Sequence, residues 1–91
     1  MKWDRLKLFN VVAQAGNITR ASEILNQSQS SLSRQMKTLE HEIGSKLFLR
    51  SSDGINLTRE GRTLFNYVSN LVLNIDKIRD KIKDDENNPS G

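Results

Sequence analysis

The sequence predicts a mainly α-helical fold, in which three short helices and a two-stranded β-hairpin precede one long helix. Apolar residues recur at three- and four-residue spacing in four stretches of the chain, which is the period of one helix face. Between the third and fourth stretches, two short strand-like runs flank the pair Asp53-Gly54, a strong hairpin-turn signal. A chain of 91 residues is long enough for one small core but too short to add an enclosed ligand cavity.

The first two predicted helices are short and meet at a glycine. Gly16 ends the first helix, and Asn17 then offers a good N-cap for the second. The apolar face of the first helix comprises Leu6, Phe9, Val12 and Ala13. The apolar face of the second comprises Ile18, Ala21, Ile24 and Leu25. Asn26 and Gln27 form the break before the next helix.

The third predicted helix has one apolar and one polar side. Ser28 caps this helix, and Gly44 stops it where a left-handed residue is favoured, so it covers residues 29–43. On a helical wheel, one narrow arc holds the apolar residues Leu32, Met36, Leu39 and Ile43. A separate arc, centred about 130° away, holds the polar residues Gln29, Ser30, Ser33, Arg34 and Lys37. We therefore expect the first arc in the core and the second facing outward.

The hairpin and the fourth helix complete the predicted fold. The two strands are expected at residues 47–50 and 55–57, and Thr58 then caps the fourth helix, with Glu60 in its first turn. Apolar residues follow at spacings of 4, 3, 4, 3 and 4: Leu64, Val68, Leu71, Ile75, Ile78 and Ile82. This heptad seam is about 27 Å long, more than so small a domain covers by itself, so we expect it to bury against a second copy. Residues 85–91 contain no apolar side chain and are predicted to form a flexible polar tail.

Charge and composition exclude several classes of function. The chain has 14 basic and 11 acidic residues, and residues 1–62 contain 10 of the basic and 6 of the acidic ones. The positive excess therefore lies in residues 1–62, where it suits a polyanionic partner. With no cysteine and one histidine, we expect no disulfide, no metal site, no cofactor and no enzyme activity. No small-molecule site is expected within this chain. Its apolar runs are too short to cross a bilayer, so we expect a cytoplasmic protein without membrane contact.

The order of helix, short helix, capped longer helix and hairpin is the plan of a winged helix-turn-helix domain. The motifs at residues 6–9, 15–22, 25–36, 39–50 and 57–61 closely resemble the DNA-binding domain of LysR-type bacterial transcription regulators. The resemblance runs from about Leu6 into the fourth helix. Three departures are small: Asn17 replaces the usual serine, Ser22 a usual second alanine, and Ser31 a common alanine. Asn17 keeps the capping chemistry, and we expect the Ser22 hydroxyl to bond back to a carbonyl of the preceding turn.

This resemblance implies sequence-specific binding of double-stranded DNA by a homodimer that regulates transcription. Residues 1–57 would form the winged helix-turn-helix domain, and residues 58–84 the linker and dimerisation helix. The resemblance further implies that the fourth helices pair antiparallel through the heptad seam, and that the DNA site is an interrupted palindrome with A·T-rich arms. Members of the family normally carry a C-terminal effector-binding domain, and this chain ends where that domain would begin.

The predicted DNA contacts divide into two groups. The base-reading candidates lie in the first turns of the third helix: Gln29, Ser30, Ser33 and Arg34. Among them, Gln29 can pair with adenine and Arg34 with guanine. The DNA-backbone candidates are Thr19, Arg20, Lys37 and Arg50. Thr19 and Arg20 belong to a first helical turn, where free backbone N–H groups and a cation together favour phosphate.

One alternative of another class stays open. A truncated regulator could act as a protein-interaction module that forms mixed dimers with a full-length homologue, because the heptad seam suits that role equally well. RNA binding is disfavoured, since no aromatic stacking platform is evident. Phe65 and Tyr67 instead flank the seam and are expected to pack the fourth helix onto its own domain.

Overall fold

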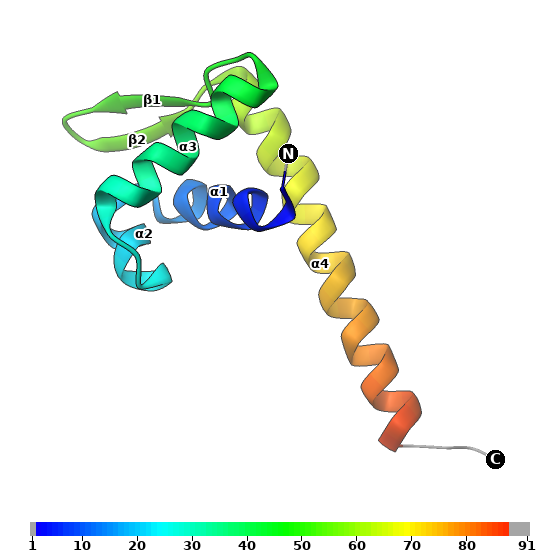
Figure 1. The fold of residues 1–91 in the computed structure, drawn as a ribbon. Helices are drawn as coiled ribbons and strands as arrows, with labels where there is room; N and C mark the ends of the chain where they lie inside the picture. The colour runs from blue at the N-terminus through cyan, green and yellow to red at the C-terminus, as the bar shows by residue number, and fades with distance from the viewer. Residues whose placement is uncertain (1, 88–91) are drawn as a thin grey trace.

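The computed structural model describes residues 2–87 and has the predicted order of elements. Four helices and one antiparallel hairpin follow one another along the chain: α1 (Trp3–Ala15), α2 (Ile18–Leu25), α3 (Gln29–Ile43), β1 (Phe48–Ser51), β2 (Gly54–Leu57) and α4 (Arg59–Asn87). Helices α1, α2 and α3 and the hairpin form a body, from which α4 projects (Figure 1). The predicted mainly helical fold with a short hairpin and a long final helix is therefore confirmed.

The helix boundaries follow from local capping chemistry. The Asn17 side chain accepts a hydrogen bond from the Arg20 N–H at 3.1 Å, and the Ser28 hydroxyl accepts one from the Ser31 N–H at 3.1 Å. Each bond satisfies a backbone donor that has no partner inside its helix. At the other ends, Gly16 and Gly44 adopt left-handed conformations with φ of 68° and 85°. The predicted starts of α2 and α3 and the predicted ends of α1 and α3 are confirmed.

The core lies where α1, α3 and the start of the hairpin meet. Phe9, Leu32, Leu39 and Leu47 are fully buried there, and the Phe9 ring lies 5.3 Å from that of Phe48 between centroids. Met36 is also buried, and Ile43 packs against this cluster. The predicted apolar side of α3 is thus confirmed as its core side.

One predicted core residue of α2 is wrong: Ile24 is 59% exposed. The buried residues of this helix are Ala21 and Ser22, with Leu25 packed beside them. Ile24 lies about 110° from this side on a helical wheel, because successive helical residues turn by about 100°. Ser22 tolerates burial because its hydroxyl donates to the Thr19 carbonyl at 2.7 Å, which confirms the predicted bond to the preceding turn.

Each strand of the hairpin reaches one residue closer to the turn than predicted: β1 covers residues 48–51 instead of 47–50, and β2 covers 54–57 instead of 55–57. The strands pair with Phe48 opposite Leu57 and Ser51 opposite Gly54, so Ser52 and Asp53 form the connecting turn. Gly54 begins β2 with φ of 130°, and a Cβ there would lie 2.5 Å from the Gly16 carbonyl oxygen. That same oxygen accepts the Ile55 N–H at 2.9 Å. The glycine is therefore required for the close approach of the hairpin to the connection between α1 and α2.

Helix α4 begins inside the body and continues beyond it. The Thr58 hydroxyl caps this helix by accepting the Gly61 N–H at 2.9 Å, as predicted. Val68 of this helix is buried, and Leu71 is exposed. The helix continues beyond the body (Figure 1) and ends at Asn87, so residues 85–87 of the predicted tail are helical. The rest of that tail, residues 88–91, lies outside the described residues. No helix within residues 2–87 has the length and apolar character to span a membrane.

Candidate nucleic-acid interface

The outer side of α3 presents the polar residues that the sequence singles out. Gln29, Ser30, Arg34 and Lys37 are exposed, while Ser33 is half-buried. All five lie outside the arc of Leu32, Met36 and Leu39, which the core buries. The body thus holds α3 by its apolar side and brings the predicted base-reading residues together on one continuous outer surface, the α3 polar face.

The turn between α2 and α3 is fixed by a contact that sequence reasoning missed. Asn26 adopts a left-handed conformation with φ of 54°, and the next residue, Gln27, accepts a hydrogen bond from the Gln35 side chain at 3.1 Å. The Gln35 amide also donates to the Ser31 hydroxyl at 3.3 Å. The helix-turn-helix unit is therefore closed by side chains on the inner flank of α3, which leaves the α3 polar face unobstructed.

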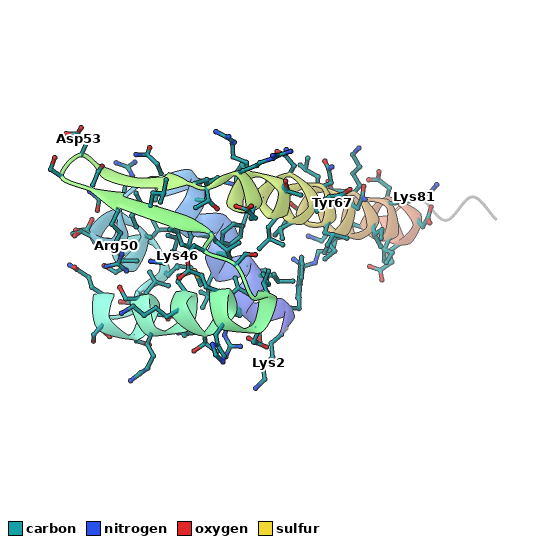
Figure 2. The ribbon with its side chains drawn as sticks, turned by 90° about the horizontal axis from the view of Figure 1, so that it is seen from above. Lys2, Lys46, Arg50, Asp53, Tyr67 and Lys81 are labelled. Atoms are coloured by element: carbon teal, nitrogen blue, oxygen red, sulfur yellow. The ribbon has the colours of Figure 1, made fainter. Side chains whose placement is uncertain are left out.

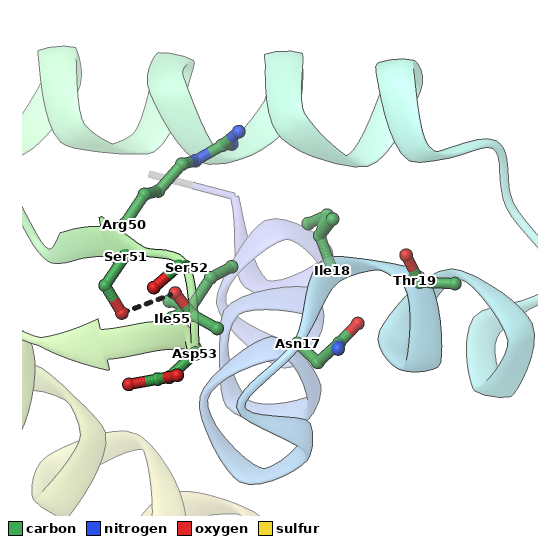
Figure 3. A pocket seen from close by; sticks show the side chains of 9 residues that line it. Asn17, Ile18, Thr19, Arg50, Ser51, Ser52, Asp53 and Ile55 are labelled. Atoms are coloured by element: carbon green, nitrogen blue, oxygen red, sulfur yellow. Dashed lines mark hydrogen bonds between the residues drawn. The ribbon is translucent and has the colours of Figure 1, made fainter.

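Thr19 and Arg20 are exposed in the first turn of α2. Thr19 lines a hollow of about 250 Å³ between the start of α2 and the hairpin, together with Asn17, Ile18 and Arg50 (Figure 3). Of the predicted backbone-contacting residues, the structure brings Thr19 and Arg50 to the same hollow. The amide, hydroxyl and guanidinium groups have the chemistry to bind a phosphate, and Asp53 adds one negative charge to the same lining.

Arg50 connects the hairpin to the α3 polar face. Its Nη2 donates to the Ser33 hydroxyl at 3.1 Å, and its side chain points from β1 toward α3 (Figures 2 and 3). Lys46 lies nearby, and both cations line a second hollow of about 430 Å³ between α3 and β1, which Lys37 also borders. Three positive charges therefore border this hollow between helix and hairpin, against one negative charge from Glu40.

Glu40 holds the start of the hairpin against α3, a role that the sequence did not predict. Its Oε2 accepts the backbone N–H of Leu47 at 2.7 Å and that of Phe48 at 3.3 Å. The position of Glu40, one helical turn after buried Met36, is the signal that could have indicated this inward role. The contact fixes β1, and with it Arg50, at a set distance from α3.

Glu42 takes part in a separate contact at the end of α3. Its carboxylate accepts a hydrogen bond from Arg5 of α1 at 2.5 Å. Desolvation raises the pKa of Glu42, but the hydrogen bond and the positive charge of Arg5 outweigh it and hold the pKa below its ordinary value. This negative charge is thereby neutralised away from the α3 polar face.

The predicted heptad seam on α4 divides into two parts. Leu64 is half-buried and packs against the body core, and Val68 is 1% exposed, so the body covers Leu64 in part and Val68 almost completely. The distal part is free: Leu71, Ile78 and Ile82 are exposed and Ile75 is half-buried. Burial inside the chain is the physical reason why Val68 has no surface left to offer a second copy.

An apolar hollow adjoins the buried part of the seam. It measures about 370 Å³ and is lined by Ile43, Leu47, Leu64 and Tyr67 among others. Tyr67 is 69% exposed, so the prediction that it packs α4 onto the body is wrong, whereas Phe65 does pack there. Figure 2 shows Tyr67 on the part of α4 near the body and Lys81 toward its far end. Within residues 2–87, no three histidine, cysteine or acidic side chains are grouped so as to hold a metal ion.

Comparison with known proteins points to one family. The family described as "Bacterial regulatory helix-turn-helix protein, lysR family" matches residues 3–62. The chain is 36% identical over 86 residues to the HTH-type transcriptional regulator CzcR of Bacillus cereus, and also 36% identical over 86 residues to the regulator SoxR of an Arthrobacter species. Each match covers 94% of this chain but only 30% and 29% of those regulators, so the chain spans less than a third of their length.

Two solved structures of isolated domains are similar over nearly their whole length. The DNA complex of the BenM DNA-binding domain at catB site 1 has a TM-score of 0.85 and 32% identity, covering 100% of this chain and 98% of that one. The DNA complex of the CbnR DNA-binding domain has a TM-score of 0.79 and 34% identity, covering 91% and 95%. The arrangement of four helices and a hairpin is therefore that of a winged helix-turn-helix domain.

Proposed function

The chain belongs to the LysR family of bacterial regulatory helix-turn-helix proteins and contains the DNA-binding domain of such a transcription regulator, and from this premise we propose how it binds DNA. The proposal is that a homodimer binds a specific duplex sequence, with α3 of each copy in the major groove. The observation that carries it is the α3 polar face: exposed amide, hydroxyl and guanidinium groups on a helix whose opposite side is locked into the core.

The base-reading residues of this proposal are Gln29, Ser30, Ser33 and Arg34. All four belong to the first two turns of α3, which is the part of a recognition helix that reaches base edges. Gln29 can donate to and accept from adenine, and the planar guanidinium of Arg34 can bind guanine through two parallel hydrogen bonds. The two serine hydroxyls are short enough to bind a base edge or a phosphate.

The backbone contacts of this proposal are made by Thr19, Arg20, Lys37 and Arg50. Thr19 and Arg20 present a hydroxyl and a cation beside the first-turn N–H groups of α2, while Lys37 lies one turn beyond Arg34. Arg50 reaches the same surface from the hairpin, where its remaining N–H donors are available beyond the one bound to Ser33. Such contacts fix the position of the domain on a duplex and carry no sequence preference themselves.

The homodimer of this proposal forms through α4. The positions of the seam residues are symmetric about Leu73. In an antiparallel pair centred there, Leu71 lies opposite Ile75 of the second copy and Leu64 lies opposite Ile82 of the second copy. The apolar hollow beside Leu64 and Tyr67 lies where that distal end would pack. A parallel pair would instead place both bodies at one end and leave the hollow without a filling residue.

A dimer with twofold symmetry requires a site with the same symmetry. Two α3 helices would contact successive major-groove faces of an interrupted palindrome, with A·T-rich arms as the family resemblance implies. Residues 1–57 then serve as the DNA-binding unit and residues 58–84 as the dimerisation helix. Support comes from the BenM and CbnR DNA-binding domains, both described as complexes with DNA.

The test is selection of bound duplexes by the purified chain, followed by titration of the selected site. Arg34→Ala is expected to weaken binding by about 1–3 kcal/mol and to relax the preference at one base pair. Arg79→Ala is the matched control, because it removes an exposed arginine from α4, outside the α3 polar face. Equal effects of the two substitutions would contradict the base-reading role. No binding by the chain alone, with capture of a longer homologue, would favour the mixed-dimer alternative.

A further inference from the structure

Hydrogen bonds hold helix α4 to the body at its start and at one place along its length. At the start, the cap residue Thr58 donates its backbone N–H to the Leu47 carbonyl at 2.9 Å and its hydroxyl to the Lys46 carbonyl at 2.6 Å. The apolar residues Leu64, Phe65 and Val68 supply most of the packing, and burial of apolar surface has no preferred direction. Within residues 2–87, the single side-chain hydrogen bond that joins α4 to another helix or to the hairpin runs from the Asn10 amide of α1 to the Ser69 hydroxyl, at 3.0 Å. The hydrogen bond between Asn10 and Ser69 therefore favours one orientation of α4 over slightly tilted or rotated orientations.

Asn10 is an unusual residue for this place in the fold. It is 6% exposed beside the core residues Phe9 and Val12, where an apolar side chain would pack without any need for partners. Its amide oxygen is also occupied, because Gln14 donates to it at 2.9 Å. The amide is thus held from both ends, and a buried amide that loses its partners costs free energy. Small rotations of α4 that apolar packing alone would tolerate are penalised here.

We propose that Asn10 and Ser69 are positioning residues that fix the angle between the body and α4, and thereby set the half-site spacing that the dimer accepts. This inference rests on the proposed DNA-binding homodimer. From Ser69 to Ile82 α4 extends about 20 Å, so a tilt of about 10° at Ser69 would move Ile82 by about 3 Å. That displacement is close to the rise of about 3.4 Å per base pair. The body of the second copy is attached to the paired α4, so it would move by a similar distance. A tilt of about 10° would therefore change the preferred half-site spacing by about one base pair.

The test replaces both partners by apolar residues. Asn10→Leu combined with Ser69→Ala removes the directional bond without leaving a buried polar group unpaired, a change that is often neutral or stabilising. Thermal unfolding and sedimentation check that the double variant folds and dimerises. Ser69→Ala alone serves as a second variant, and Ser69→Thr, which keeps a hydroxyl, is the matched control that should retain wild-type behaviour.

Two readouts separate this inference from the proposed function. The first is affinity for three duplexes: the selected site, and the same site with one base pair inserted or deleted between its halves. One base pair also rotates the second half-site by about 35°. The wild-type chain and Ser69→Thr are expected to lose at least about tenfold in affinity on either altered duplex. The double variant is expected to lose less than about threefold on the same duplexes. Its affinity for an isolated half-site should be unchanged. An equal spacing penalty in the wild type and the double variant would overturn the inference.

The second readout needs no DNA. Because the chain contains no cysteine, His41→Cys places one spin label per copy on the exposed surface of α3. The distance distribution between the two labels of a dimer is expected to be narrow in the otherwise unchanged chain and clearly broader with Asn10→Leu and Ser69→Ala. Distributions of equal width would also overturn the inference. Failure of the wild-type chain to bind even an isolated half-site would contradict the proposed function, while a change in width would still support the positioning role.

Discussion

Glu40 gives a direct measure of how firmly the hairpin is held beside α3. Its carboxylate accepts two backbone N–H groups, from Leu47 at 2.7 Å and from Phe48 at 3.3 Å. Leu47 is fully buried, so its N–H has no access to water once the carboxylate is removed. A hydrogen bond to a charged group contributes about 1.5–3 kcal/mol, and the longer bond adds less, so Glu40→Ala should lower the free energy of unfolding by about 3 kcal/mol.

Thermal unfolding followed by circular dichroism measures this loss. In a domain of this size, about 1 kcal/mol corresponds to about 4–8 °C in Tm, so a loss of about 3 kcal/mol in Glu40→Ala should lower the Tm by about 12–24 °C. Glu40→Gln keeps one carbonyl acceptor, so its Tm should lie between those of the wild type and Glu40→Ala. All variants are compared at one protein concentration, because the Tm of a dimer depends on it.

Glu42→Ala is the matched control for this experiment. It removes a carboxylate from the same helix, two residues away, where the group is exposed and paired with Arg5. Exposed ion pairs contribute little to stability, so the Tm should stay near that of the wild type. Equal losses of Tm in Glu40→Ala and Glu42→Ala would refute the assignment of Glu40 as the residue that anchors the hairpin.

Three further predictions concern the dimer, the DNA backbone and pH. Leu71→Glu combined with Ile75→Glu should give folded monomers in sedimentation, and a double variant that stays dimeric would contradict the seam. Val68→Ala should instead keep the dimer and lower the free energy of unfolding by about 2 kcal/mol, because Val68 packs inside its own chain. Lys37→Ala should weaken binding to all duplexes alike and reduce the slope of log affinity against log salt by about one, and an unchanged slope would remove it from the phosphate contacts. Because the folded-state pKa of Glu42 is lowered, its stabilising effect is complete above its unfolded pKa of about 4.3 and is lost as pH falls through the folded value. The Tm of the wild type should therefore exceed that of Glu42→Gln by a small margin at neutral pH, because the ion pair is exposed, and this margin should vanish at low pH. A constant difference would contradict that assignment.

The parts of the fold that the sequence predicts are those governed by near neighbours. Asn17, Ser28 and Thr58 each accept the N–H of the residue three positions on, so a cap is recognisable from the sequence alone. The two sides of α3 follow from helical periodicity in the same way. For this reason the bounds of α3 agree with the prediction residue for residue.

The remaining features depend on contacts between residues far apart in the chain. Asn10 and Ser69 are 59 positions apart, and Arg50 and Ser33 are 17 apart, so no local pattern indicates either pair. The extension of β2 to Gly54 has the same origin, because the Gly16 carbonyl accepts the Ile55 N–H and lies too close to Gly54 for any side chain there. The sequence places Val68 in the seam because periodicity shows an apolar stripe but not which part of it the body covers.

The most direct test of the central claim, that the α3 polar face binds in the major groove, uses the selected duplex with single purines replaced by their 7-deaza analogues. This replacement removes only the N7 acceptor, which lies in the major groove. If the α3 polar face binds in the major groove, affinity should fall at a few purines in two symmetric groups, about one or more helical turns apart. At the guanine read by Arg34, the replacement should cause no further loss once Arg34→Ala is present. Undiminished binding at every substituted position would contradict this claim.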